Sequence, residues 1–126
     1  MKQITPEQIA QFDGYIVKWQ GLLNLNDWRL IRSPKLAKGS CAEVSASAVD
    51  RTAVYRIGNH FGLEEMTDQT LEGTAIHELL HVLLTEYRDM CLLKQSEDAI
   101  MGAEHRIVQT LERLLTPKSL HMENHV

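Results

Sequence analysis

The spacing of apolar residues changes twice along this chain, and these changes limit its possible folds. Between residues 5 and 24, apolar side chains recur every three or four positions, which is typical of a helix with one buried face. Residues 28–57 instead hold short β-branched runs in which polar and apolar residues alternate, and residues 67–115 return to the helical spacing. The order of one helix, a small sheet and two helices predicts an α+β fold.

The first helix has a clear start in the sequence. Thr5 is suited to cap it, Pro6 to occupy its first position and Gln8 to close a capping box with Thr5. The turn-prone Asn24 and Asn26 mark its end. Its apolar stripe consists of Ile9, Phe12, Ile16, Trp19 and Leu23. We therefore expect this helix to be a scaffold element.

Three short strands are predicted in the middle of the chain. Their sequences are WRLI, CAEVSASAV and TAVYRI, and turn-forming residues separate them. Asp50 and Arg51 favour a hairpin between the last two strands. In the middle strand, Val44 alternates with Ser45, which indicates a sheet with one covered face. TAVYRI is the candidate for an exposed edge that could hold an extended peptide.

Length and composition indicate a single globular domain. The chain has 126 residues, of which 44% are hydrophobic and 24% are charged, and a chain of this size can bury a core without disulfides. The predicted domain covers residues 1–126, with a flexible tail over about 117–126.

The composition also restricts location and partners. A net charge of -4 makes nucleic acid an unfavourable partner, because sequence-independent binding to phosphates needs a basic face. No stretch approaches the roughly 18 apolar residues of a membrane span, and the first residues do not resemble a signal peptide. Cys41 and Cys91 form no CxxC arrangement, which gives disulfide or thiolate-metal interpretations little support. We expect a cytoplasmic protein of bacterial or phage origin that does not bind membranes.

The predicted helix from Thr67 to about Arg88 carries the sequence HELLH. His77 and His81 are four residues apart, so on a helix their imidazoles sit one turn above each other and can bind the same ion. Apolar neighbours such as Leu79 provide the semi-buried surroundings that a metal site needs. The motif predicts a site for zinc, although two histidines and a carboxylate also accept iron, manganese or cobalt. The alternative is a helix with two incidental histidines.

Glu78 is rotated away from the two histidines on this helix. A carboxylate at this position is poorly placed to chelate the ion with them, but it is well placed to touch a metal-bound water as the general base of a hydrolysis. Tyr55, Tyr87 and Arg88 are weaker candidates for stabilising an oxyanion.

A catalytic zinc needs a third protein ligand and an open position for water. The last helix, from Ser96 to Leu115, offers Glu104, which falls on an apolar stripe where a carboxylate needs a positive partner. The stripe consists of Ile100, Ile107, Leu111 and Leu114. His105 on the flank of that helix and His60 in the loop before the metal helix are alternative ligands, and a salt bridge between Glu104 and an arginine is the structural alternative.

HELLH followed by Ala103-Glu104-His105-Arg106-Ile107-Val108 resembles the minimal zincins of phages and prophages, and also the ImmA/IrrE metallopeptidases. The resemblance follows the order of elements over nearly the whole chain and rests chiefly on the two helices. It implies a minimal zincin-like fold with an N-terminal helix, a small three-stranded sheet, the HExxH helix and a C-terminal helix.

The resemblance also implies an activity, the zinc-dependent hydrolysis of peptide bonds in a peptide or protein substrate. It implies His77, His81 and Glu104 as zinc ligands and Glu78 as the catalytic base and acid. Phage-type proteins often have a second acidic residue where this chain has His105, so the third ligand stays open. The alternative function is that of a catalytically silent zincin-fold binding or regulatory protein with a structural zinc.

Overall fold

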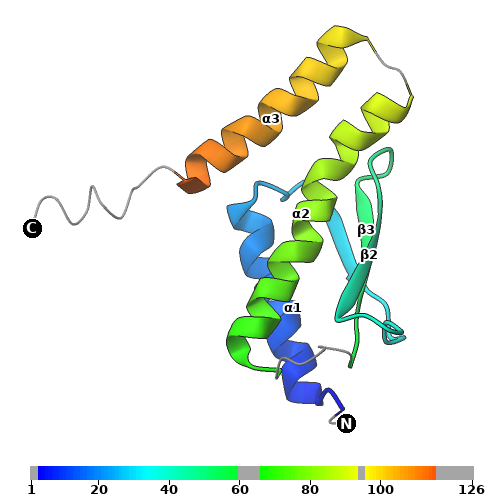
Figure 1. The fold of residues 1–126 in the computed structure, drawn as a ribbon, viewed down its shortest axis with the longest axis vertical. Coiled ribbons are helices and arrows are strands. Elements are labelled where there is room, and N and C mark those ends of the chain that lie inside the picture. The colour runs from blue at the N-terminus through cyan, green and yellow to red at the C-terminus, as the bar shows by residue number, and fades with distance from the viewer. Residues whose placement is uncertain (1–2, 60–65, 94–95, 116–126) are drawn as a thin grey trace, which may run out of the picture.

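The computed structural model describes residues 3–59, 66–93 and 96–115 of the chain (Figure 1). The elements in chain order are α1 (Pro6–Leu22), β1 (Arg29–Arg32), β2 (Ala42–Ser47), β3 (Thr52–Ile57), α2 (Asp68–Leu92) and α3 (Glu97–Leu115). This order confirms the predicted α+β arrangement. Within these residues, none of the helices has the length and apolar character that crossing a membrane requires. The predicted tail and His60 lie outside the described residues.

The helices α1 and α2 begin where their capping residues predict. The Thr5 hydroxyl accepts the N–H of Gln8, and the Gln8 side chain accepts the N–H of Thr5, which completes the capping box. At α2, the Thr67 hydroxyl accepts the N–H of Thr70 at 3.1 Å. α2 ends at Leu92, about one turn beyond the expected end.

The sheet has the strand order β1-β3-β2, so β3 is its central strand. β2 and β3 form the predicted hairpin across Asp50 and Arg51, with Val44 opposite Tyr55. β1 pairs with β3 in parallel. The prediction that TAVYRI forms an exposed edge is therefore wrong, because this segment is β3 and bonds to a strand on each side.

The helices α1 and α2 cover the same face of the sheet (Figure 1). Residues from the three elements form one buried cluster, chiefly Phe12 and Ile16 of α1, Ala53, Tyr55 and Ile57 of β3, and Leu71, Ala75, Leu79 and Val82 of α2. The ring centroids of Phe12 and Tyr55 are 5.9 Å apart. The domain is therefore a two-layer structure in which α2 lies along the sheet.

α3 packs against the C-terminal half of α2 and extends away from the sheet (Figure 1). Ala103 and Thr110 are buried, whereas Glu104 and Leu111 are exposed, so the predicted stripe that included Glu104 is wrong in part. Small side chains at 103 and 110 allow the two helices to approach closely. This contact rotates α3 so that Glu104 lies on its flank.

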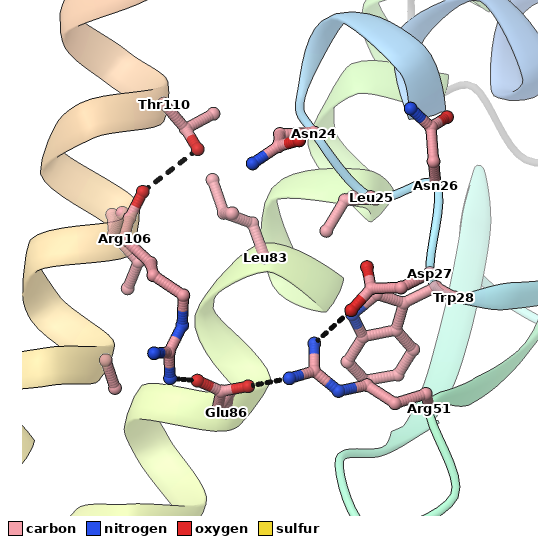
Figure 2. Close-up of a pocket in the computed structure, with 12 residues that line it drawn as sticks. Asn24, Leu25, Asn26, Asp27, Trp28, Arg51, Leu83, Glu86, Arg106 and Thr110 are labelled. Atoms are coloured by element: carbon pink, nitrogen blue, oxygen red, sulfur yellow. Dashed lines mark hydrogen bonds and ion pairs between the residues drawn. The ribbon is translucent and has the colours of Figure 1, made fainter. Parts of the chain in front are cut away.

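A series of charged side chains connects α3 to the rest of the fold (Figure 2). Glu86 of α2 pairs with Arg106 of α3 and with Arg51, which follows β2. Arg51 also pairs with Asp27 at 3.0 Å, and its guanidinium lies 5.7 Å from the ring centroid of Trp28. The Glu86 side chain is 14% exposed, so solvent screens its two ion pairs less than pairs between fully exposed side chains.

Tyr55 connects β3 to α1 through a contact that depends on pH. Its hydroxyl donates to Oδ1 of Asp13 at 2.7 Å. Burial, and then this hydrogen bond, raise the pKa of Tyr55 above its ordinary value of 10.0. The folded state favours the neutral phenol. The hydrogen bond of Tyr55 therefore contributes fully to stability below pH 10.0, and its contribution is lost as the pH rises above this value.

We expect Tyr55→Phe to lower the free energy of unfolding by about 1 kcal/mol at neutral pH. The difference from the parent protein should shrink above pH 10.0, because only the parent has the Tyr55 phenol to ionise. Urea unfolding at both pH values measures this. A difference that stays the same at the two pH values would contradict the assigned role of the hydroxyl.

Candidate functional site

α2 presents His77 and His81 to solvent while its opposite side faces the core. The buried side of the helix includes Ala75 and Leu79, and successive residues are turned by about 100° around a helix. Both histidines therefore fall on the exposed side, one turn apart. Glu78 lies between the exposed histidines and the buried stripe.

The two imidazoles converge on one point. Their Nε2 atoms are 3.3 Å apart, and the ring planes are inclined at 78° with centroids 4.9 Å apart. A tetrahedral zinc ion with Zn–N bonds of about 2.0–2.1 Å holds two nitrogens about 3.3 Å apart. The same separation allows a hydrogen bond between neutral rings when no ion is bound. His77 and His81 thus have the spacing of two ligands to a common ion.

Glu78 places a buried carboxylate next to this pair. The residue is 7% exposed. Burial raises the pKa of Glu78; the charges of His77 and His81 act to lower it, and Glu43 adds to the rise. A carboxylate with a raised pKa beside two imidazoles is suited to accept and release a proton.

A groove between α2 and β2 contains these residues. It consists of two adjoining cavities of about 650 Å³ and 490 Å³, which share His77 and Glu78 in their walls. Polar residues from the first turns of α2, Gln69, Thr70 and Thr74, line one end, and Thr85 and Arg88 line the other. The wall opposite α2 includes Ala42, Val44 and Ala46 of β2. The candidate base therefore lies in the middle of an elongated groove.

β2 borders the groove with a strand edge that pairs with no other strand among the described residues. The carbonyl of Cys41 accepts the N–H of Gly58 at 2.8 Å, so residues 41, 43, 45 and 47 bond to β3 in the alternating antiparallel pattern. The backbone N–H and C=O groups of Ala42, Val44 and Ala46 consequently point to the side away from β3. β3 leaves these groups available for another extended chain.

The structure does not bring Glu104 to the two histidines. Glu104 is exposed on α3 and interacts with Tyr87 of α2, whose pKa is raised first by Cys91 and then by Glu104. In the part of the chain that the structure describes, no group of three or more His, Cys, Asp or Glu side chains is arranged to hold a metal ion. Glu104 stays a predicted ligand, and His105 is likewise exposed on α3.

His77, His81 and Glu78 of α2 nevertheless fit a metal ion in two respects. Two imidazole nitrogens have the required separation, and an ion beside them would offset the charge of the buried Glu78 carboxylate. A third donor is needed in addition to this pair.

Sequence reasoning missed the β2 wall of the site. Ser40 and Ala42 line both cavities, and the Ser40 hydroxyl is a buried group without a hydrogen-bond partner among the described residues. The alternation in β2 indicates its covered face, but it carries no signal that this strand is the edge next to α2. Of the oxyanion candidates, Arg88 lines the groove, whereas Tyr55 lies in the core.

Comparisons with known proteins assign no family to this chain. No family model, no curated protein and no solved structure matches it. The interpretation of the groove therefore rests on its own geometry and chemistry.

The buried carboxylate should make the metal-free protein less stable than a neutral variant. Because the pKa of Glu78 is raised in the folded state, folding is disfavoured as the pH rises above the ordinary value of 4.5, where the unfolded carboxyl ionises first. Glu78→Gln removes this penalty. We expect the chelator-treated variant to melt a few degrees above the parent at neutral pH, with little difference below pH 4.5. Melting curves over this pH range test it, and a variant that melts lower at neutral pH would contradict it.

Proposed function

We propose that this chain is a zinc-dependent peptidase whose site lies in the groove between α2 and β2. The observation that carries the proposal is the 3.3 Å separation between Nε2 of His77 and Nε2 of His81, since it equals the separation of two ligands on one tetrahedral ion. The buried Glu78 beside them supplies the group that a hydrolase needs for proton transfer.

In this proposal each residue has a separate role. His77 and His81 hold the ion, with Glu104 as the predicted third ligand. Bound zinc supplies a Lewis acid that polarises a carbonyl group and makes water more acidic. Glu78 accepts the proton of the attacking water and delivers it to the leaving amine, and burial brings its pKa closer to neutral pH, where such a transfer is most effective.

The open edge of β2 gives the substrate a place to bind. An extended peptide in the groove can pair with the outward backbone groups of Ala42, Val44 and Ala46, as in strand addition to a sheet edge. Backbone pairing places a peptide bond beside Glu78 without requiring a particular side chain. The groove thus supports a peptide as the substrate class.

A second candidate is a binding protein that holds an extended segment without cleaving it. The exposed position of Glu104 on α3 favours it, because two imidazoles alone make an incomplete catalytic zinc site. Zinc content together with cleavage assays separates the two functions, since a binding protein would retain peptide affinity after chelation.

Substitutions at the motif separate zinc binding from catalysis. We expect the parent protein to bind about one zinc ion per chain and His77→Ala to weaken zinc binding by roughly 100-fold or more. Glu78→Gln should keep zinc but lower peptide cleavage by about 100-fold or more, because only the proton-transfer group is lost. Metal analysis and cleavage of a mixed peptide library measure these effects.

Glu97→Gln is the matched control for Glu78→Gln, because it removes an exposed carboxylate of α3 outside the groove. It should change neither zinc content nor cleavage. Normal cleavage by Glu78→Gln would show that the proposed mechanism is wrong. Unchanged zinc binding by His77→Ala would show that the proposed metal site is wrong.

The role of β2 can be tested by removing one outward N–H. Val44→Pro should keep the fold and the zinc site, because the N–H of residue 44 does not bond to β3. It should lower peptide cleavage by about tenfold or more, since a backbone contact to the substrate is lost. Val44→Ala shortens the same side chain and retains the N–H, so it should cleave nearly as well as the parent. Equal cleavage by the two variants would rule out strand addition at this position.

A further inference from the structure

Arg88 places a cation at one end of the groove. It lines the same cavity as His77, Glu78 and His81, and it is seven residues beyond His81 on α2. Seven residues of helix correspond to about 10 Å along the axis. The side chain of Arg88 therefore leaves α2 on the groove side, about 10 Å along the helix axis from His81.

Arg88 makes only a long ion pair within the described residues. Its ion-pair partner among the described residues is Asp89, at 3.9 Å, and the Arg88 side chain is 68% exposed. Glu43, the acidic residue of β2 that lines this cavity, already pairs with Arg56 at 3.2 Å. A negatively charged group in the groove would consequently find a guanidinium with donors available for a bidentate contact.

The direction of the strands determines which part of a substrate reaches Arg88. α2 and β2 run the same way along the groove, since Ala42 lies with the first turns of α2 and Ala46 with Thr85 and Arg88 (Figure 1). A peptide paired antiparallel to β2, the more common pairing, places its N-terminal part at Arg88. An extended chain rises about 3.3 Å per residue, so about 10 Å corresponds to roughly three residues.

From these contacts we infer that Arg88 selects substrates with an acidic side chain roughly two to four residues before the cleaved bond. This inference rests on the proposed peptidase function and names its substrate class, a peptide with Asp or Glu on the N-terminal side of the cleavage site. Arg88 acts by binding the substrate and takes no part in the proton transfer of Glu78.

The test uses the full chain loaded with zinc and a peptide library derived from cellular proteins. Sequencing of the cleaved products gives the residues that flank each cut. The parent should show Asp and Glu enriched at these positions, and a matched peptide with Gln in place of Glu should be cleaved about tenfold more slowly. Arg88→Gln should remove the enrichment, and Arg88→Glu should shift it to Lys and Arg.

Arg29→Gln is the matched control, because it removes an exposed arginine of β1 on the opposite edge of the sheet. It should keep the acidic preference. Cleavage without acidic enrichment on the N-terminal side, or enrichment that survives in Arg88→Gln, would overturn the inference and leave the peptidase function in place. If the zinc-loaded parent cleaves no peptide in the library, the peptidase function is overturned and this inference with it.

Discussion

The rotation of α2 about its own axis is the constraint on which the site depends. Leu71, Leu79 and Val82 are buried against α1 and the sheet, and burial of such side chains contributes roughly 1.5–3 kcal/mol each. A different rotation of α2 would expose part of this stripe. The contacts that stabilise the core therefore also keep His77 and His81 in the groove beside β2.

Glu78 is the residue at which stability and the proposed function conflict. It is three residues after Ala75 and four before Val82, so it lies at the margin of the buried stripe, where an apolar side chain would be more stabilising. Departures from consistent apolar patterning are expected at functional sites. At this position the core is less stable than it would be with an apolar residue, and a carboxylate with a raised pKa lies beside the two imidazoles.

Features that depend only on residues close together in the sequence were predictable. The caps at Thr5 and Thr67 form as expected, and the spacing within HELLH determines the separation of the imidazoles because a helix fixes the geometry of residues four apart. The stripe of α3 was harder to predict, since two apolar patterns overlap there. Packing on α2 selects the pattern with the small Ala103 and Thr110, and Glu104 moves to the flank.

The identity of the edge strand could not be predicted, because it depends on pairing between distant segments. Every second residue of β3 is buried, and polar residues alternate with small apolar ones in β2, so both strands have the period of a sheet with one covered face and this period does not identify the edge. The parallel pairing of β1 with β3 identifies the edge, because β1 occupies the second side of β3. Within the described residues, the outer side of β2 is therefore left without a strand partner next to α2. If β1 had paired with β2 instead, the backbone groups of Val44 would be bonded within the sheet, and the histidines would face a strand unable to bind a peptide. Access for the proposed extended substrate therefore follows from the order of the strands, and the HELLH motif alone does not provide it.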